Sequence, residues 1–498
     1  MSNKYQPQNY MAYRRKSSVL SNSQDHLWGI RAILAVQSFA WLFFKVFDPA
    51  LTVPGPTTTG EHVPNSAPST VPGVFGGPGI TAPGAGSGIV ARDLYSGDLY
   101  TRDLYRRNLS DIPSFTEHSP HYQVLLRKIL SPFLWEESFI FCFFILLSAR
   151  TVCIPFLRDV TSNTYARSLI ARPIRMFIPL AIGLAISLAI FGSINTQYLE
   201  EFAYINGNPF LRAPEKPASA LACFNSIWDL LWVTKDYSLQ MGNLAFPSWT
   251  LWVPSAIYLQ SYTVYIFMVI LPFSRPSWHI TGLLMFAFGS WWFNSWGWYS
   301  ATGLFLADVA INPPLRTALF RGWSNESGSV RMPYWALAYV FLAVGTGLKY
   351  MWIAGLPDLF WSGEAHAHPS RYLGGSSFGY ADGTQPYPRM DDWLVIVGIL
   401  LLIEFSETTK RILSNKALKA IGRRSLSYYL VSTILMYTAG IKIYLYCNTS
   451  AGLTSASAKA AAFFVVLPCS IIGGEIFHWA IDKQAVWASH AFFDWTRK

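Results

Sequence analysis

Apolar residues in this chain are grouped in long runs that recur from near the N-terminus to near the C-terminus. A run of about 20 apolar residues is the length that an α-helix needs to cross the hydrocarbon layer of a membrane. The pattern therefore predicts an all-α, polytopic integral membrane helix bundle with about ten transmembrane helices. We expect these helices at residues 28–47, 133–152, 173–194, 249–272, 278–295, 297–311, 335–355, 392–405, 425–446 and 460–481. The segments at 278–295, 297–311 and 392–405 are the weakest of them, because they are short or closely spaced.

The segments between these runs divide the chain into a membrane domain and two tails. Residues 1–27 are polar and are predicted to form a disordered cytosolic tail, residues 28–487 form the membrane domain, and residues 488–498 form a second cytosolic tail. Residues 48–131 are predicted to be a long extracytoplasmic loop, because their first half is dominated by Pro, Gly, Thr and Ser. Its end, RDLYSGDLYTRDLYRRNLS, has a five-residue period that fits neither a helix nor a strand face. Low-complexity expansion and a binding motif are the two interpretations of this repeat.

Lysine and arginine are concentrated in the connections that lie on one side of the predicted bundle. Basic residues mark the cytosolic side of membrane proteins, so this asymmetry predicts that both termini are cytosolic. The basic positions are Lys4, Arg14, Arg15 and Lys16, then Arg158, Arg167 and Arg172, then Arg316, Arg321 and Arg331, and finally the segment KRILSNKALKAIGRR at 410–424. The opposite loops carry Glu200, Glu201, Glu215, Asp358, Asp391 and Asp392.

Composition supports the same class of protein and excludes others. The chain is 52% hydrophobic and only 13% charged, so it has too little polar surface to cover soluble domains of this size. The net charge of +10 follows from the topology, and we do not expect binding to nucleic acid. The first apolar run is too long for a cleavable signal peptide and is predicted to remain as an anchor. We therefore expect a multi-pass protein of the secretory pathway or plasma membrane.

Two further sequence features bear on the predicted topology. The glycosylation sequons at Asn108 and Asn448 lie on the extracytoplasmic side, whereas the one at Asn325 lies on the cytosolic side. Cys223 and Cys447 also fall in extracytoplasmic loops, where an oxidising compartment would permit a disulfide between them.

Several segments, in order, resemble the membrane acyltransferase 3 family, particularly its members from filamentous fungi. The resemblance covers almost the whole chain outside the N-terminal tail and the long first loop. The segments are GIRAILAVQSF, FFILLSARTVCIPFLRD (143–159), SLIARPIRMFIPL (168–180), WTLWVPSAIYLQSYTVY (249–265), GLFLADV (303–309) and LIEFSETTKRILSNKALKAIGRRSLSYYLV (402–431).

The resemblance implies a function. Members of that family resemble ten-helix transferases that move an acyl group, other than an aminoacyl group, from a cytosolic acyl-CoA to a hydroxyl of a carbohydrate, lipid or small molecule. Acyl-CoA would then be a co-substrate, and no resident cofactor is implied. A catalytically silent homologue that binds lipid or acyl-CoA as a sensor is the first alternative. A transporter is the second, although the two halves show no convincing inverted repeat.

The family pattern is incomplete at the position of its presumed general base. In the family's first helix an arginine is followed, after ten intervening residues, by a histidine; here Arg31 matches the arginine, but Leu42 stands at the histidine position. Ile257 and Ser432 stand at two further positions that are polar or acidic in the family. Leucine cannot accept the proton of an attacking hydroxyl. His26 is expected to precede the helix and therefore not to replace the base.

The cationic end of the family pattern is retained. Arg172 and Arg175 are three residues apart and share a helix face, and Pro173 is expected at the start of that helix, where free backbone N–H groups suit a phosphate of CoA. Anchoring of these arginines to anionic headgroups is the alternative. Arg150, at the end of the second helix, is a further candidate for this phosphate-binding cluster.

Other ionisable residues are expected at a similar depth. Asp308 and Glu404 are candidates for structural ion pairing with Arg31, and Glu475 and His478 could form a replacement acid–base pair. His366 and His368 lack a third ligand nearby, so no metal site is predicted. We expect Arg31 to face the bundle interior and to line the same site as Arg172 and Arg175, because an unpaired arginine deep in lipid costs at least about 2.5 kcal/mol. A snorkelling position among the headgroups is the alternative for Arg31.

Overall fold

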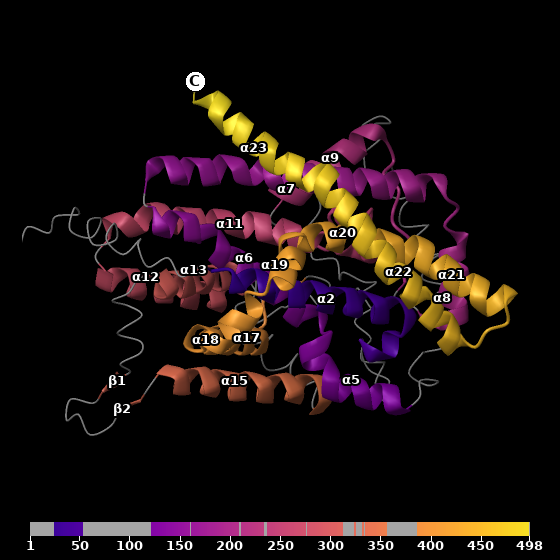
Figure 1. The fold of residues 1–498 in the computed structure, drawn as a ribbon, viewed down its shortest axis with the longest axis horizontal. Coiled ribbons are helices and arrows are strands. Elements are labelled where there is room, and N and C mark those ends of the chain that lie inside the picture. The colour runs from indigo at the N-terminus through magenta and orange to yellow at the C-terminus, as the bar shows by residue number, and fades with distance from the viewer. Residues whose placement is uncertain are drawn as a thin grey trace, which may run out of the picture.

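The computed structural model describes the membrane-embedded part of the chain as a bundle of helices. Seven helical segments are long and apolar enough to cross a membrane. The long helices α2, α7, α11 and α15 run roughly along the long axis of the molecule (Figure 1). The described residues are 24–52, 121–159, 161–208, 211–233, 237–274, 276–311, 323–324, 331–332, 334–355 and 386–497.

The candidate spans are built from single helices or from helices joined end to end. They run over His26–Phe47, His121–Arg158, Ser162–Ser193, Trp252–Ile270, Trp335–Ala354, Ser425–Ser450 and Ser455–Thr496. The α-helices within them are α2 (His26–Phe47), α5 (His121–Leu134), α6 (Glu137–Arg158), α7 (Ser162–Ser193), α11 (Trp252–Ile270), α15 (Tyr334–Tyr350), α20 (Ser425–Leu435), α21 (Ile441–Leu445), α22 (Ser455–Phe477) and α23 (Lys483–Thr496).

The remaining α-helices, 3-10 helices and strands lie outside these candidate spans. The α-helices are α8 (Gln197–Asn206), α9 (Ala220–Trp232), α10 (Met241–Leu244), α12 (Pro276–Trp292), α13 (Gly297–Ile311), α17 (Met390–Phe405), α18 (Glu407–Leu413) and α19 (Lys416–Arg423). Short 3-10 helices are η1 (Pro49–Leu51), η2 (Pro247–Trp249) and η3 (Leu271–Phe273), and a two-residue antiparallel pair joins β1 (Trp323–Ser324) to β2 (Arg331–Met332).

π-helical turns interrupt the later spans. They are η4 (Met351–Gly355), η5 (Met436–Gly440), η6 (Tyr446–Ser450) and η7 (His478–Asp482). A π-helical turn is rare and is found most often as a single turn inside an α-helix, frequently at a functional site. Two of these turns join α20 to α21 and α22 to α23, so each of the last two spans is continuous but not uniformly α-helical.

Several helix boundaries differ from those expected from the sequence. Helix α2 begins at His26, two residues early, so His26 belongs to the helix after all. Helix α7 begins at Ser162, with the side chain of Thr161 as its N-cap, and Pro173 therefore lies inside it. The expectation that Arg172 and Arg175 sit at a helix N-terminus is wrong. Proline is common in the first turn of a helix, and the sequence therefore predicts a helix start at Pro173. A proline is also tolerated inside a membrane helix, and Pro173 is of that kind.

Two segments that we expected to be non-helical are helical. The described part of the predicted loop at 48–131 includes helix α5, and the predicted tail at 488–498 continues helix α23 to Thr496. The three weakest predicted spans form α12, α13 and α17, which are 17, 15 and 16 residues long. Residues 53–120, including the proline-rich stretch and the five-residue repeat, lie outside the described residues, as do Asn325, His366 and His368.

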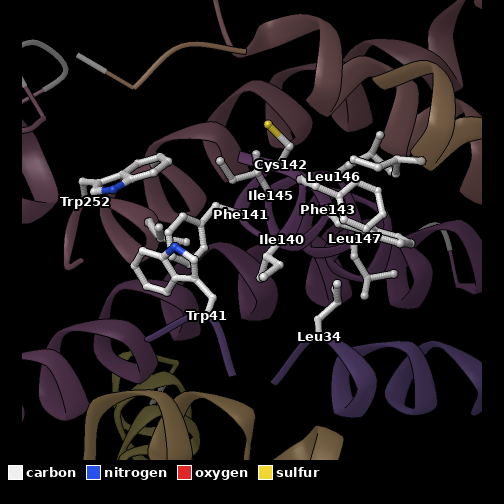
Figure 2. Packing of buried hydrophobic residues seen from close by; sticks show 14 of the residues in the cluster. Leu34, Trp41, Ile140, Phe141, Cys142, Phe143, Ile145, Leu146, Leu147 and Trp252 are labelled. Carbon is white, nitrogen blue, oxygen red and sulfur yellow. The ribbon is translucent and has the colours of Figure 1, made fainter. Parts of the chain in front are cut away.

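Helix α6 is at the centre of the bundle. It contacts α2, α11, α13 and α17, and nearly every residue from Phe139 to Leu157 is buried. The apolar character of α6 on all sides fits this central position, because its faces meet other helices. Figure 2 shows Phe141 between Trp41 and Trp252, with ring centroids 5.1 and 5.5 Å away.

The start of α2 packs directly on the backbone of the segment formed by α18 and α19. A Cβ atom added to Gly29 would overlap with the carbonyl group of Leu413, and one added to Gly422 would overlap with the carbonyl group of Trp28. Only glycine permits such an approach from both sides, because the atoms in the way belong to the backbone and cannot rotate aside. These two glycines therefore fix the distance between α2 and the α18–α19 segment.

A buried ionic network joins the ends of α6, α15 and α17. Lys349 is fully buried and pairs with both Glu136 and Asp392, while Arg389 bonds to Glu136 at 3.0 Å and to Asp391 at 2.7 Å. The hydroxyl of Ser138 donates to Asp392 at 2.5 Å. Three carboxylates thus face two cations, and each charge has at least one opposite partner. Such a network tolerates burial only while it stays complete.

We predict that Gly422→Ala destabilises the protein by about 1–3 kcal/mol, because the new methyl group must push α2 away from α19. The matched control is Gly347→Ala in α15, where an added Cβ has nothing within 4 Å. It should be neutral or slightly stabilising, since alanine is the better helix former. Thermal unfolding of the detergent-solubilised protein measures both. Equal melting temperatures for the two variants would contradict the close contact.

We predict that Lys349→Met costs about 3–5 kcal/mol, because it leaves three carboxylates with Arg389 alone. Adding Asp392→Asn should recover part of that loss, since the double variant removes one charge of each sign. The same unfolding measurement tests this. A double variant less stable than Lys349→Met would show that Lys349 does not act through charge pairing.

Candidate functional site

Arg31 lies one turn into α2 and points towards α6. Its Nη2 donates to the hydroxyl of Thr151 at 2.7 Å, and its guanidinium carbon lies 5.0 Å from the centre of the Trp28 ring. The Thr151 hydroxyl in turn donates to the carbonyl of Ser148 at 3.0 Å. Arg31 therefore faces the bundle, but its hydrogen-bond partner is a neutral hydroxyl and not an acidic residue.

Arg172 reaches the same turn of α6 from α7. Its Nη2 donates to the hydroxyl of Ser148 at 3.0 Å, three residues before Thr151, and its buried Nε has no hydrogen-bond partner among the described residues. Arg175 is exposed on α7, and its charge and that of Arg172 both act on Arg31. The structure thus brings together Arg31, Arg172 and Arg175, which we call the cationic site.

No carboxylate among the described residues lies within ion-pair distance of the three guanidinium groups of the cationic site. Tyrosines of α11 lie next to Arg172 instead: Tyr258, Tyr262 and Tyr265 all interact with its charge. The hydroxyls of Tyr258 and Tyr262 are 2.6 Å apart, and Tyr265 donates to the carbonyl of Ser168 at 3.0 Å. Two guanidinium groups that are hydrogen-bonded to the hydroxyls of Thr151 and Ser148, with no described carboxylate at ion-pair distance, form a donor-rich setting that suits an anion such as phosphate.

Arg150 belongs to a separate cluster. It is completely buried and pairs with Glu404, which also lies 3.5 Å from Nε2 of His26 and 3.3 Å from Nζ of Lys410. Arg150 is therefore neutralised within the protein, and Glu404 pairs with Arg150 and not with Arg31. His26 is only 1% exposed, and the sequence did not indicate its place in this cluster.

The positions at which the family pattern is incomplete are packed as apolar core. Leu42 is 2% exposed and belongs to the main hydrophobic cluster, and Ile257 packs against that cluster from α11. Ser432 is buried, and its hydroxyl donates to the carbonyl of Tyr429 at 3.3 Å in its own helix. Asp308 is buried on α13. The side chains of Leu42, Ile257 and Ser432 cannot serve as a general base.

Glu475 and His478 do not pair with each other. Glu475 pairs with Arg424 and accepts a hydrogen bond from the hydroxyl of Tyr428 at 2.5 Å. Nδ1 of His478 lies 2.9 Å from a carboxylate oxygen of Asp482, and these two residues are the first and last of the π-helical turn η7. A carboxylate that holds Nδ1 leaves Nε2 as the nitrogen able to accept a proton.

The structure describes both cysteines of the predicted disulfide and one of the two predicted glycosylation sites. Cys223 and Cys447 are both free thiols in the structure, so the predicted disulfide between them is not formed. Cys223 lies on α9, whereas Cys447 lies in the helical turn η6 after α21. The sequence places both cysteines on one side of the membrane but does not say whether these two elements are neighbours. Asn448 is half-buried in η6, and Asn108 lies outside the described residues.

Comparison with known proteins gives no further assignment. No protein-family model, no curated protein and no solved structure matches this chain.

Proposed function

We propose that this protein binds an acyl-CoA at the cationic site and transfers its acyl group to a hydroxyl of a lipid, carbohydrate or small molecule. In this proposal the chain crosses the membrane about ten times, with α12, α13 and α17 as the short spans, and both termini are cytosolic. The cationic site then opens towards the cytosol, where acyl-CoA is found.

The observation that supports the proposal most directly is the unbalanced charge of the cationic site. Burying cations without counter-charges is expensive, and an arginine in a membrane helix is normally paired or faces a functional site. Among the described residues, the hydrogen bonds of Arg31 and Arg172 go to hydroxyls on one turn of α6, and Arg31 also lies against the Trp28 ring. An anionic ligand would complete the site, and the phosphates of CoA meet guanidinium groups in paired, charge-assisted hydrogen bonds.

The chemistry of transfer requires a base in addition to the donor site. The acceptor oxygen attacks the thioester carbonyl carbon, the bond to the CoA sulfur breaks, and the acceptor proton must go to a base. We propose His478 for this role, because Asp482 orients its ring and leaves Nε2 available. Leu42 cannot take part.

The second candidate function is acyl-CoA or lipid binding without transfer. The observation that favours it is the packing of Leu42, Ile257 and Ser432, which places apolar or internally bonded side chains where the resembling family has polar ones. A protein of this kind would respond to the ligand but would not consume it.

We predict that Arg31→Gln and Arg172→Gln each weaken binding of palmitoyl-CoA about tenfold or more, since a hydrogen bond to a charged group contributes about 1.5–3 kcal/mol. Arg411→Gln, at an exposed arginine of α18, is the control, and Leu42→Ala should also leave affinity nearly unchanged. Equilibrium binding of labelled palmitoyl-CoA to the purified protein measures this. If Arg411→Gln weakens binding as much as Arg31→Gln does, the effect is non-specific charge and the site is excluded.

We predict that the purified protein releases free CoA from palmitoyl-CoA when it is offered a lipid and sugar extract. His478→Gln should reduce release by about 10²-fold or more, the usual contribution of a positioned general base, without loss of palmitoyl-CoA binding. His26→Gln is the comparison, because His26 is also close to a carboxylate. Binding without any release would replace the transferase proposal by the second candidate.

A further inference from the structure

A cavity of about 310 Å³ lies between the C-terminal part of α7 and the start of α9. Its walls are mainly apolar and include Leu188, Phe191 and Ala245, and the thiol-bearing Cys223 also lines it. Leu188 follows Arg172 by 16 residues on α7, which is about 24 Å along the helix axis. The cavity is therefore far from the cationic site and close to the opposite membrane surface.

Helix α9 carries an apolar stripe on the side that faces away from this cavity. Leu221, Phe224, Trp228 and Trp232 are 68%, 54%, 41% and 54% exposed. Their spacing of three, four and four residues places them on one face, and Cys223 lies on the opposite face. The stripe covers the outside of α9, while Ala220 and Cys223 of its first turn line the cavity.

The length of α9 shows how it meets the membrane. Thirteen residues give a helix of about 20 Å, which is too short to cross a hydrocarbon layer of about 30 Å. It therefore enters the layer only part of the way, and it runs along α7 towards α11: Trp228 packs on Phe177 and Trp232 on Tyr258, with ring centroids 5.0 and 5.9 Å apart. The exposed parts of the stripe then face the lipids of one leaflet, and the cavity lies beside the first turn of α9.

The rim of the cavity is polar. Glu215 and Lys216 line it, Lys216 is exposed, and the backbone N–H of Glu215 donates to the carbonyl of Leu244 at 3.0 Å and holds the rim segment in place. Mainly apolar walls with an ammonium group and a carboxylate at the rim match a molecule that has an alkyl chain and a zwitterionic head. At this depth the membrane supplies such a molecule in the form of its phospholipids.

We propose that this cavity takes one acyl chain of a phospholipid from the leaflet in which α9 lies, with the lipid phosphate at Lys216. The site does not depend on acyl-CoA binding or on acyl transfer. It gives α9 a second contact with the membrane: the exposed side chains of its stripe meet the bulk lipids, and Ala220 and Cys223 of its first turn contact one bound chain.

The test uses the full-length protein in nanodiscs that contain phosphatidylcholine with a photoactivatable diazirine near the end of one acyl chain. After illumination, we expect adducts on the α7 peptide that contains Leu188 and Phe191, in addition to those on the exposed stripe of α9. Gly192→Leu should reduce the α7 adducts at least fivefold, because Gly192 lines the cavity and an added Cβ meets nothing within 4 Å. Gly289→Leu in α12, where an added Cβ also meets nothing within 4 Å, is the matched control.

Each outcome decides one part of the proposal. Adducts confined to the stripe, or α7 adducts that persist in Gly192→Leu, would overturn the cavity site. Lys216→Gln should reduce the α7 adducts from phosphatidylcholine but not those from a diazirine-labelled fatty alcohol, and equal labelling by both probes in that variant would overturn the assignment of the phosphate. An unchanged melting temperature of Gly192→Leu shows that the loss of adducts is not caused by unfolding.

Discussion

Charged side chains that lie between apolar helices must be neutralised, and the two ends of this bundle meet that requirement in different ways. Around Lys349 the protein supplies its own counter-charges, three carboxylates for two cations, within a network that joins α6, α15 and α17. Around Arg31 the described residues supply hydroxyls and the Trp28 ring, and none of their carboxylates lies at ion-pair distance. The first end carries its own counter-charges, whereas the described residues place none beside the guanidinium groups of the second. Because the cations at the other end are paired with carboxylates, the arginines of the cationic site differ from ordinary basic residues of this protein.

The position of the cationic site depends on how closely α2 approaches its neighbours. Gly29 lies two residues before Arg31 and brings α2 against the α18–α19 segment on one side, while the Arg31 guanidinium contacts α6 on the other. The same α18–α19 segment carries Lys410, which helps to neutralise Glu404 beside Arg150. The backbone contact at Gly29 and the approach of Glu404 to His26 therefore both hold the start of α2.

The class of fold could be predicted from the sequence, because runs of about 20 apolar residues that recur along a chain are typical of membrane spans and rare in soluble domains. Its details could not. The start of α7 was missed because Pro173 resembles a first-turn residue, and α9 was missed because its length falls below that of a span. For the site, residue type and spacing identified Arg31, Arg172 and Arg175, but the choice of partners depends on which helices are neighbours. The pairing of Glu404 with Arg150 and the burial of His26 both depend on such neighbours and could not be predicted.

The π-helical turns in the last two spans affect how this chain should be compared with other sequences. Each such turn accommodates one more residue than an α-helical turn would, so every side chain that follows it is rotated by about 100° relative to a continuous α-helix. Ser432 precedes η5 and keeps its place, whereas residues after Gly440 and after Asp482 are displaced by one position. A relative without these turns would align correctly only with a single-residue gap inside each helix. An ungapped comparison would pair residues that face different neighbours.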